Sequence, residues 1–128
     1  MIIHEAAENY LEAIYMIRIR KGGCRSIDVA NELGYSKPTG SVMMKNLRES
    51  EYINVDAQGD ITLNECGLEI ARKMYERHEL IAAALIALGV SEENAYRDSC
   101  RIEHDMSAET FEAVKRYITT VLKERNGL

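Results

Sequence analysis

The chain has 128 residues, a length that fits one ordinary domain or a small DNA-binding domain followed by a helical appendix. Hydrophobic residues make up 46% and charged residues 29%, with a single proline, which excludes a disordered chain and predicts a mainly helical globular protein. The net charge of −5 argues against indiscriminate binding to polyanions, so any DNA contact must use a local basic surface.

Nothing in the sequence indicates a membrane segment or an export signal. The chain has no run of about 18 apolar residues, and residues 1–5 lack the basic and apolar segments of a signal peptide. Cys24, Cys66 and Cys100 are an odd number without CxxC spacing, which favours neither a disulfide framework nor a zinc ribbon. We therefore expect a cytoplasmic protein without a membrane partner.

The first expected element is an amphipathic helix over residues 5–20. Its apolar positions recur at spacings of three and four residues, which is the period of one helix face. Asn9 and Glu12 lie three residues apart and can project together from this helix. The helix is expected to end before residues 21–23, where two glycines follow a lysine.

Two further helices joined by a tight turn follow. Ser26 predicts the N-cap of a short helix that ends before Gly34, a residue suited to the left-handed position after a helix. Ser36 predicts the next N-cap, with Pro38 in the first turn, where a missing N–H costs little. The pair predicts a helix-turn-helix, whose second helix enters the DNA major groove, although any small helical protein can offer such a pair.

A β-hairpin after the second of these helices strengthens the DNA-binding interpretation. Residues 52–55 and 61–63 alternate with period two on either side of a turn. A hairpin in this position is the wing of a winged helix. The basic side chains that we expect on the exposed face of the recognition helix, within reach of DNA phosphates, are Lys37, Lys45 and Arg48.

The C-terminal half predicts three more helices. Thr62 and Glu65 have the spacing of a capping box and start a long helix that runs to about Leu88. Ser91 starts the next helix, and Ser107 caps the last one. A domain of this size has little room to bury both apolar stripes, so we expect the C-terminal helices to form a symmetric homodimer.

The fold class is therefore expected to be mainly α, in two domains. Residues 1–63 are expected to form a winged helix-turn-helix DNA-binding domain with a two-stranded wing. Residues 64–128 are expected to form a helical domain for metal binding and dimerisation.

One face of the helix after Ser91 carries three residue types that bind metals. Cys100, Glu103 and His104 occupy positions i, i+3 and i+4, and such positions share a helix face. A thiol, a carboxylate and an imidazole together suit Fe²⁺, Co²⁺ or Zn²⁺ better than Ca²⁺ or Mg²⁺. A metal cluster and a DNA-reading module in one small chain indicate a metal-switched transcription regulator.

Four segments carry a family resemblance. They are Glu-Asn-Tyr-Leu-Glu-Ala-Ile-Tyr at 8–15, Ser-Lys-Pro-Thr at 36–39, Arg-His-Glu-Leu at 77–80, and Cys-x-x-Glu-His-x-Met-Ser at 100–107. Together they resemble the diphtheria-toxin-repressor family of metal-dependent winged-helix repressors of iron or manganese uptake. The resemblance covers nearly the whole chain. Without an SH3-like third domain, the chain looks closer to the two-domain, manganese-regulating branch.

The resemblance implies a metal site drawn from three helices. Its ligands would be Asn9, Glu12, His78, Cys100, Glu103 and His104. Glu12 resembles the manganese branch, whereas Cys100 stands where iron regulators have Cys and manganese regulators have Glu. Asn9 departs from both branches, which have Asp or Met there. Because a thiol and an amide replace two hard carboxylates, we favour Fe²⁺ as the metal, with Mn²⁺ second.

The iron-regulating branch also has an ancillary metal site. The resemblance places its further ligands one turn after His78 and one turn before Cys100, where this chain has Ala82 and Tyr96. We therefore expect no ancillary site.

The resemblance also implies DNA-contacting residues around the recognition helix. With the basic residues named above, the set is Ser36, Lys37, Pro38, Thr39, Ser41, Lys45 and Arg48. Where the iron branch has a base-facing Gln, this chain has Val42, so the operator sequence cannot be carried over. The expected partner is double-stranded DNA. Because a homodimer has two-fold symmetry, we expect its operator to be palindromic.

Two other functions remain as alternatives. One is a metal-independent winged-helix regulator that senses a small molecule or the oxidation of Cys100. The other is a small metallohydrolase or thiol enzyme that uses Cys100 and His104. No nucleophile elbow or oxyanion-hole signature accompanies these residues, so we expect no enzyme activity.

Overall fold

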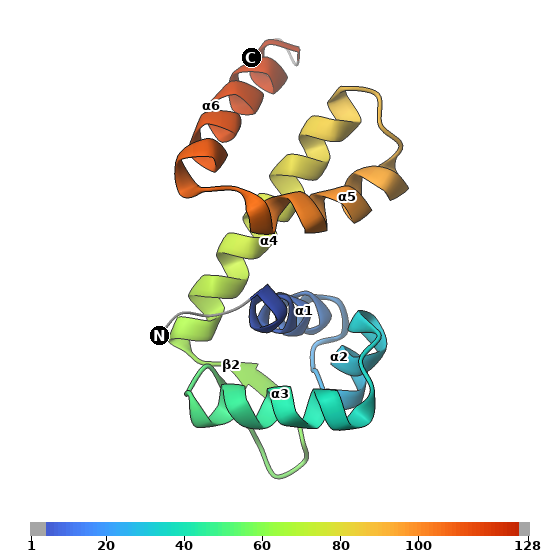
Figure 1. Ribbon diagram of the computed structural model, residues 1–128, viewed down its shortest axis with the longest axis vertical. Helices are drawn as coiled ribbons and strands as arrows, with labels where there is room; N and C mark the ends of the chain where they lie inside the picture. The colour runs from blue at the N-terminus through green and yellow to red at the C-terminus, as the bar shows by residue number, and fades with distance from the viewer. Residues whose placement is uncertain (1–4, 126–128) are drawn as a thin grey trace. The chain divides into compact units, whose positions relative to one another are not determined.

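The computed structural model describes residues 5–125, which form six helices and one two-stranded antiparallel sheet (Figure 1). In chain order the elements are α1 (Glu5–Lys21), α2 (Ser26–Leu33), α3 (Lys37–Glu49), β1 (Ile53–Val55), β2 (Ile61–Leu63), α4 (Glu65–Ala87), α5 (Glu92–Asp105) and α6 (Ala108–Arg125). This confirms the mainly α class and the winged helix-turn-helix. None of the helices described is long and apolar enough to cross a membrane.

The chain divides into two compact units, residues 1–75 and 76–128, so the division falls inside α4. The functional boundary between residues 63 and 64 stays a prediction.

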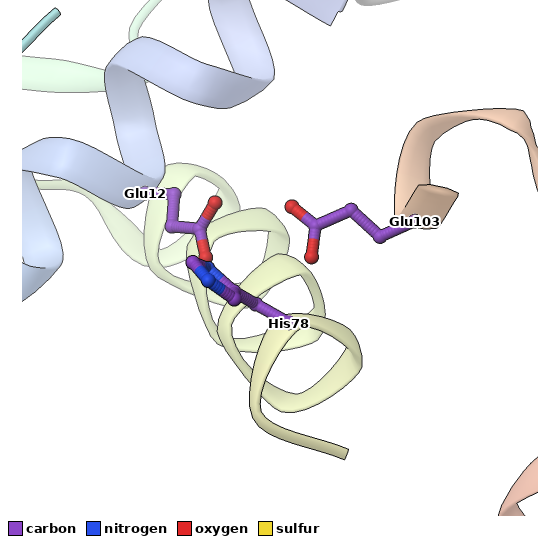
Figure 2. A group of neighbouring side chains, drawn as sticks. All are labelled: Glu12, His78 and Glu103. Atoms are coloured by element: carbon purple, nitrogen blue, oxygen red, sulfur yellow. The ribbon is translucent and has the colours of Figure 1, made fainter. Parts of the chain in front are cut away.

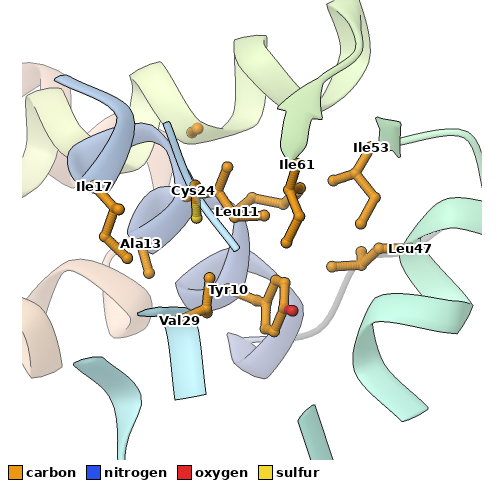
Figure 3. Packing of buried hydrophobic residues seen from close by; sticks show 11 residues of the cluster. Tyr10, Leu11, Ala13, Ile17, Cys24, Val29, Leu47, Ile53 and Ile61 are labelled. Atoms are coloured by element: carbon orange, nitrogen blue, oxygen red, sulfur yellow. The ribbon is translucent and has the colours of Figure 1, made fainter. Parts of the chain in front are cut away.

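The N-terminal unit has a continuous apolar core (Figure 3). α1 supplies its largest share, because Tyr10, Leu11, Ile14 and Ile17 are fully buried at period-3.6 spacings. The other core residues come from α2, α3 and the hairpin, and they include Val29, Leu47, Ile53 and Ile61. Each such side chain contributes about 1.5–3 kcal/mol when buried, so this core fixes the position of α3.

The caps of α2 and α3 show how the helix-turn-helix begins and ends. Arg25, not Ser26, is the N-cap of α2, so that expectation was wrong by one residue: the Arg25 N–H donates to the Asp28 carboxylate at 2.9 Å. The Ser36 N-cap is confirmed, since its hydroxyl accepts from the Thr39 N–H at 3.3 Å. Between the helices, Gly34 has φ of 72°, a left-handed conformation that costs glycine little.

The wing is a short hairpin tied to α1 at its base. Its register pairs Ile53 with Leu63 and Val55 with Ile61. The Asp60 carboxylate accepts from the Cys24 N–H at 2.9 Å and from the Arg18 guanidinium at 3.0 Å. Both hydrogen bonds lower the pKa of Asp60, and the one from the Cys24 backbone has the larger effect. Two segments distant in sequence therefore hold the wing.

The start of α4 differs from the expected capping box. Thr62 lies in β2 and pairs with Asn54 of β1, so it does not cap α4 and the expected capping box was wrong. The first helical turn instead closes on Asn64, whose carbonyl accepts from the Leu68 N–H at 2.8 Å. Gly67 follows in this turn, where a Cβ atom would overlap the Tyr52 carbonyl oxygen. Glycine here lets the helix backbone lie directly against the chain that enters the wing.

In the C-terminal unit, both predicted serine caps are confirmed. The Ser91 hydroxyl accepts from the Asn94 N–H at 3.3 Å at the start of α5. The Ser107 hydroxyl accepts from the Thr110 N–H at 3.1 Å at the start of α6. The two caps satisfy backbone N–H groups at the first turns of α5 and α6.

Candidate metal centre and DNA interface

A thiol and an imidazole from different helices meet in the C-terminal unit. The Cys100 sulfur of α5 lies 3.4 Å from Nε2 and 3.6 Å from Nδ1 of His78 on α4. His78 is buried, with 6% of its surface exposed, whereas Cys100 is exposed. The thiol can therefore meet a solvated ion at the edge of a buried imidazole.

A carboxylate and a second imidazole extend this pair. Glu103 is fully buried, and one of its oxygens lies 3.6 Å from Nε2 of His104. His78 and Glu103 each offer a ligand atom, and these atoms lie within 4.8 Å of each other (Figure 2). We call His78, Cys100, Glu103 and His104 the donor cluster. The four predicted metal-binding residues of the C-terminal unit are thus connected by pairwise approaches: Cys100 to His78, His78 to Glu103, and Glu103 to His104.

The chemistry of the donor cluster fits a divalent transition metal. A fully buried carboxylate costs several kcal/mol unless its charge is compensated by hydrogen bonds or a cation. Imidazole, carboxylate and thiolate are the usual ligands of Fe²⁺, Co²⁺ and Zn²⁺, and a set that includes sulfur disfavours Mg²⁺ and Ca²⁺. The residues present therefore fit a divalent transition metal.

Tyr96 occupies the place where an ancillary ligand would be needed. Its hydroxyl donates to the Glu79 carboxylate at 3.0 Å, and its ring meets the His78 ring edge-on, with centroids 5.6 Å apart. Ala82, one turn after His78, is fully buried and has no donor atom. The absence of an ancillary site stays a prediction, and Tyr96 packs against the imidazole of the donor cluster.

Arg77 holds the end of α5 beside His78. Its guanidinium donates to the carbonyl oxygens of Glu103 at 3.2 Å and Met106 at 3.3 Å. It also lies over the Phe111 ring of α6, 5.0 Å from the ring centroid. In the sequence, Arg77 stood out only as part of a motif. No spacing rule predicts its hydrogen bonds to Glu103 and Met106, which lie 26 and 29 positions later in the chain.

The remaining predicted ligands belong to the N-terminal unit. Glu12 is a buried charge on α1, 4% exposed, and it is drawn in Figure 2. Asn9, one turn earlier, is partly buried. A buried carboxylate is unusual on a helix whose other buried residues are apolar, because Glu is seldom fully buried unless it is paired.

The recognition helix α3 presents the predicted DNA-binding residues to solvent. Gly40 and Leu47 are its buried positions. The exposed positions include Ser36, Lys37, Pro38, Thr39, Ser41, Lys45 and Arg48. Exposed cations on a rigid helix can contact phosphates, while small polar residues at the helix start can approach base edges. The assignment of roles to these residues stays a prediction.

Comparison with known families matches both halves of the chain. Residues 3–60 match the iron dependent repressor N-terminal DNA binding domain, and residues 64–125 match the iron dependent repressor metal binding and dimerisation domain. The chain is 36% identical over 109 residues to the transcriptional regulator MntR of Salmonella typhimurium, covering 85% of this chain and 69% of that protein. It is 36% identical over 100 residues to MntR of Geobacillus kaustophilus, covering 78% and 71%.

Solved structures show the same fold. The manganese regulator SloR superposes with a TM-score of 0.76 at 24% identity, over 88% of this chain and 53% of SloR. The T. acidophilum IdeR superposes with a TM-score of 0.76 at 20% identity, over 100% of this chain and 56% of IdeR. The chain thus spans just over half the length of these two solved proteins. Together with the relatives above, they place the chain in the iron-dependent repressor family, that of the diphtheria toxin repressor, as a metal-dependent, DNA-binding transcription regulator.

Proposed function

We propose that the protein is a homodimeric, metal-activated repressor of iron or manganese homeostasis genes that binds a palindromic operator in the cytoplasm. The donor cluster of the C-terminal unit carries this proposal, since a fully buried Glu103 beside His104 and His78 suits a bound cation. The exposed cations of α3 provide the surface for DNA phosphates.

The proposed ligands are the donor cluster, Glu12 and Asn9. When bound, a metal would supply positive charge that compensates the two carboxylates, and the ligand residues would fix its position. SloR, a structural neighbour, is described as a manganese regulator, which keeps Mn²⁺ as the second choice. Fe²⁺ is favoured because the Cys100 sulfur, 3.4 Å from His78 Nε2, is softer than a carboxylate.

Glu12 provides the proposed link to DNA binding. It belongs to the unit that carries α3, whereas the donor cluster belongs to the other unit. Shared coordination would favour the arrangement in which the two recognition helices of a dimer lie about one DNA turn, roughly 34 Å, apart. Metal shifts that equilibrium only by binding the DNA-competent arrangement more tightly.

The choice of metal is tested by anaerobic titration with Fe²⁺ or Mn²⁺, with binding to a duplex selected from a random pool followed at each step. Cys100→Glu should shift the response toward Mn²⁺, and Cys100→Ser should weaken the Fe²⁺ response more than the Mn²⁺ response. Cys66→Ser is the matched control, because Cys66 is an exposed thiol outside the donor cluster. An unchanged Fe²⁺ to Mn²⁺ ratio in both Cys100 variants would remove the case for iron.

The link between the units is tested with Glu12→Gln. This variant should lose most of the metal stimulation of DNA binding while its metal-free fold is retained, whereas Glu5→Gln, an exposed change on the same helix, should not. A normal metal response in Glu12→Gln would exclude α1 from the switch. DNA binding that is insensitive to chelators would favour the metal-independent regulator instead.

A further inference from the structure

An exposed apolar patch lies on the recognition helix among its polar and basic residues. Val42 is 59% exposed, although it is a large aliphatic side chain on a helix that buries Gly40 and Leu47 on another face. A hollow of about 340 Å³ beside it is lined by Pro38, Thr39, Val42, Met43 and Asn46. These positions follow the spacing of one helix face.

Charge identifies the kind of partner that this patch can meet. Lys37, Lys45 and Arg48 are exposed on the same helix, so an anionic surface with an apolar feature is the complementary partner. Duplex DNA has such a surface in its major groove. Among the base-edge groups there, the thymine 5-methyl group is apolar, whereas the other groups are hydrogen-bond donors or acceptors.

We propose that Val42 reads the 5-methyl group of a thymine in each operator half-site and is a specificity-determining residue of this regulator. This rests on the proposed function, because it requires α3 to enter the major groove. A valine has no hydrogen-bonding group, so it selects by filling the space beside the methyl and by excluding water from it. Its selectivity is directed against cytosine, which has no methyl group, and against uracil.

The test uses uracil, which differs from thymine only by the missing methyl. With Mn²⁺ as the added metal, duplexes are selected from a random pool by the full chain, and each thymine is then replaced singly by deoxyuridine. For the parent protein, replacing either thymine of one symmetry-related pair should lower the affinity for the duplex about three- to five-fold. This is the value of one buried methyl group. In Val42→Ala this loss should fall to less than two-fold at the same pair.

Two further variants make the result specific. Val42→Thr keeps one methyl group and should retain an intermediate uracil effect. Ile19→Ala changes a residue of α1 that is 63% exposed, and it should leave the uracil effect unchanged. Because Val42 is exposed, its substitution should not alter the thermal unfolding temperature by more than a degree or two.

The outcomes separate this proposal from the function on which it rests. Equal uracil effects in the parent and Val42→Ala at every thymine would overturn the role of Val42 and leave the metal-dependent regulator intact. A complete absence of metal-stimulated binding to any duplex would overturn the proposed function and this role together. Loss of dimerisation in Val42→Ala, with uracil effects unchanged, would show that the patch contacts a second copy of the chain.

Discussion

The two units place their polar functional groups differently with respect to solvent. In residues 1–75 the core around Tyr10 and Ile14 is apolar, and the residues of α3 expected to contact DNA lie at the surface. In residues 76–128 two expected metal ligands, Glu103 at 0% and His78 at 6% exposed, are themselves buried, as is Glu12 in the first unit, whereas Cys100 is exposed. The difference teaches that the exposed residues of α3 can be substituted at little cost in stability, whereas substitution of a buried ligand changes the energetics of its unit.

Glu103→Gln should show the largest effect and test this contrast directly. The substitution keeps the shape but removes the charge, so metal affinity should fall by about 100-fold or more. Co²⁺ absorption titration measures the metal affinity, and thermal unfolding in chelator checks that the metal-free fold is retained. Glu112→Gln, an exposed change on α6, is the control. Metal affinity unchanged in Glu103→Gln would remove this residue from the ligand set.

Arg77→Met should have the next largest effect. It removes the hydrogen bonds to the Glu103 and Met106 carbonyls that hold the end of α5, so metal affinity should fall by about 10-fold. Arg77→Lys keeps a cationic donor and should recover part of the loss. Isothermal titration measures the metal affinity, and the Co²⁺ spectrum reports the coordination of the metal. Arg101→Met, on the exposed face of α5, is the control. A lower unfolding temperature with an unchanged spectrum and affinity would mean that Arg77 acts on stability alone.

A pair of glycine substitutions tests the packing of the N-terminal unit. Gly67→Ala should destabilise it by about 1–3 kcal/mol, because the added methyl overlaps the Tyr52 carbonyl oxygen. Gly40→Ala should instead stabilise it by about 0.5–1 kcal/mol, since its Cβ would meet Ala30 at an ordinary 4.0 Å and alanine favours a helix. Urea unfolding of both variants measures whether the free energy of unfolding falls or rises. Stabilisation by Gly67→Ala would contradict the close approach of α4 to residue 52.

The smallest effect concerns pH and the base of the wing. Hydrogen bonds from the Cys24 N–H and Arg18 hold the pKa of Asp60 below its ordinary value of 3.8. The ionised group therefore contributes stability above about pH 4, and this contribution is lost as the pH falls through the lowered pKa. Asp60→Asn should unfold more easily at pH 7 and show a weaker dependence on pH below about 4, as measured by thermal unfolding. Asp56→Asn would be a poor control, because its carboxylate accepts from the Gln58 and Asp60 N–H groups; Glu49→Gln, exposed at the end of α3, is the better one.

Most helix caps, which depend only on neighbouring residues, were predictable from the sequence, although Arg25 and not Ser26 caps α2. Ser36, Ser91 and Ser107 cap helices where expected, because an N-cap hydroxyl needs only an N–H group three residues later. Cys100 and Glu103 lie on the same helix for a similar reason: the helix period alone fixes which residues share a face. His78, more than twenty residues earlier in the chain, entered the ligand set through family resemblance and not through spacing.

Tertiary structure decided what depended on segments distant in sequence. Thr62 has a capping-box spacing, yet its pairing with Asn54 makes it part of a strand. Spacing along the chain could not show that Cys100 meets His78, which only the family resemblance implied. It also could not show that Arg77 reaches the end of α5 or that Gly67 faces the Tyr52 carbonyl. Local hydrogen bonds are determined by spacing along the chain, whereas these contacts exist only once apolar burial has brought separate helices and strands together.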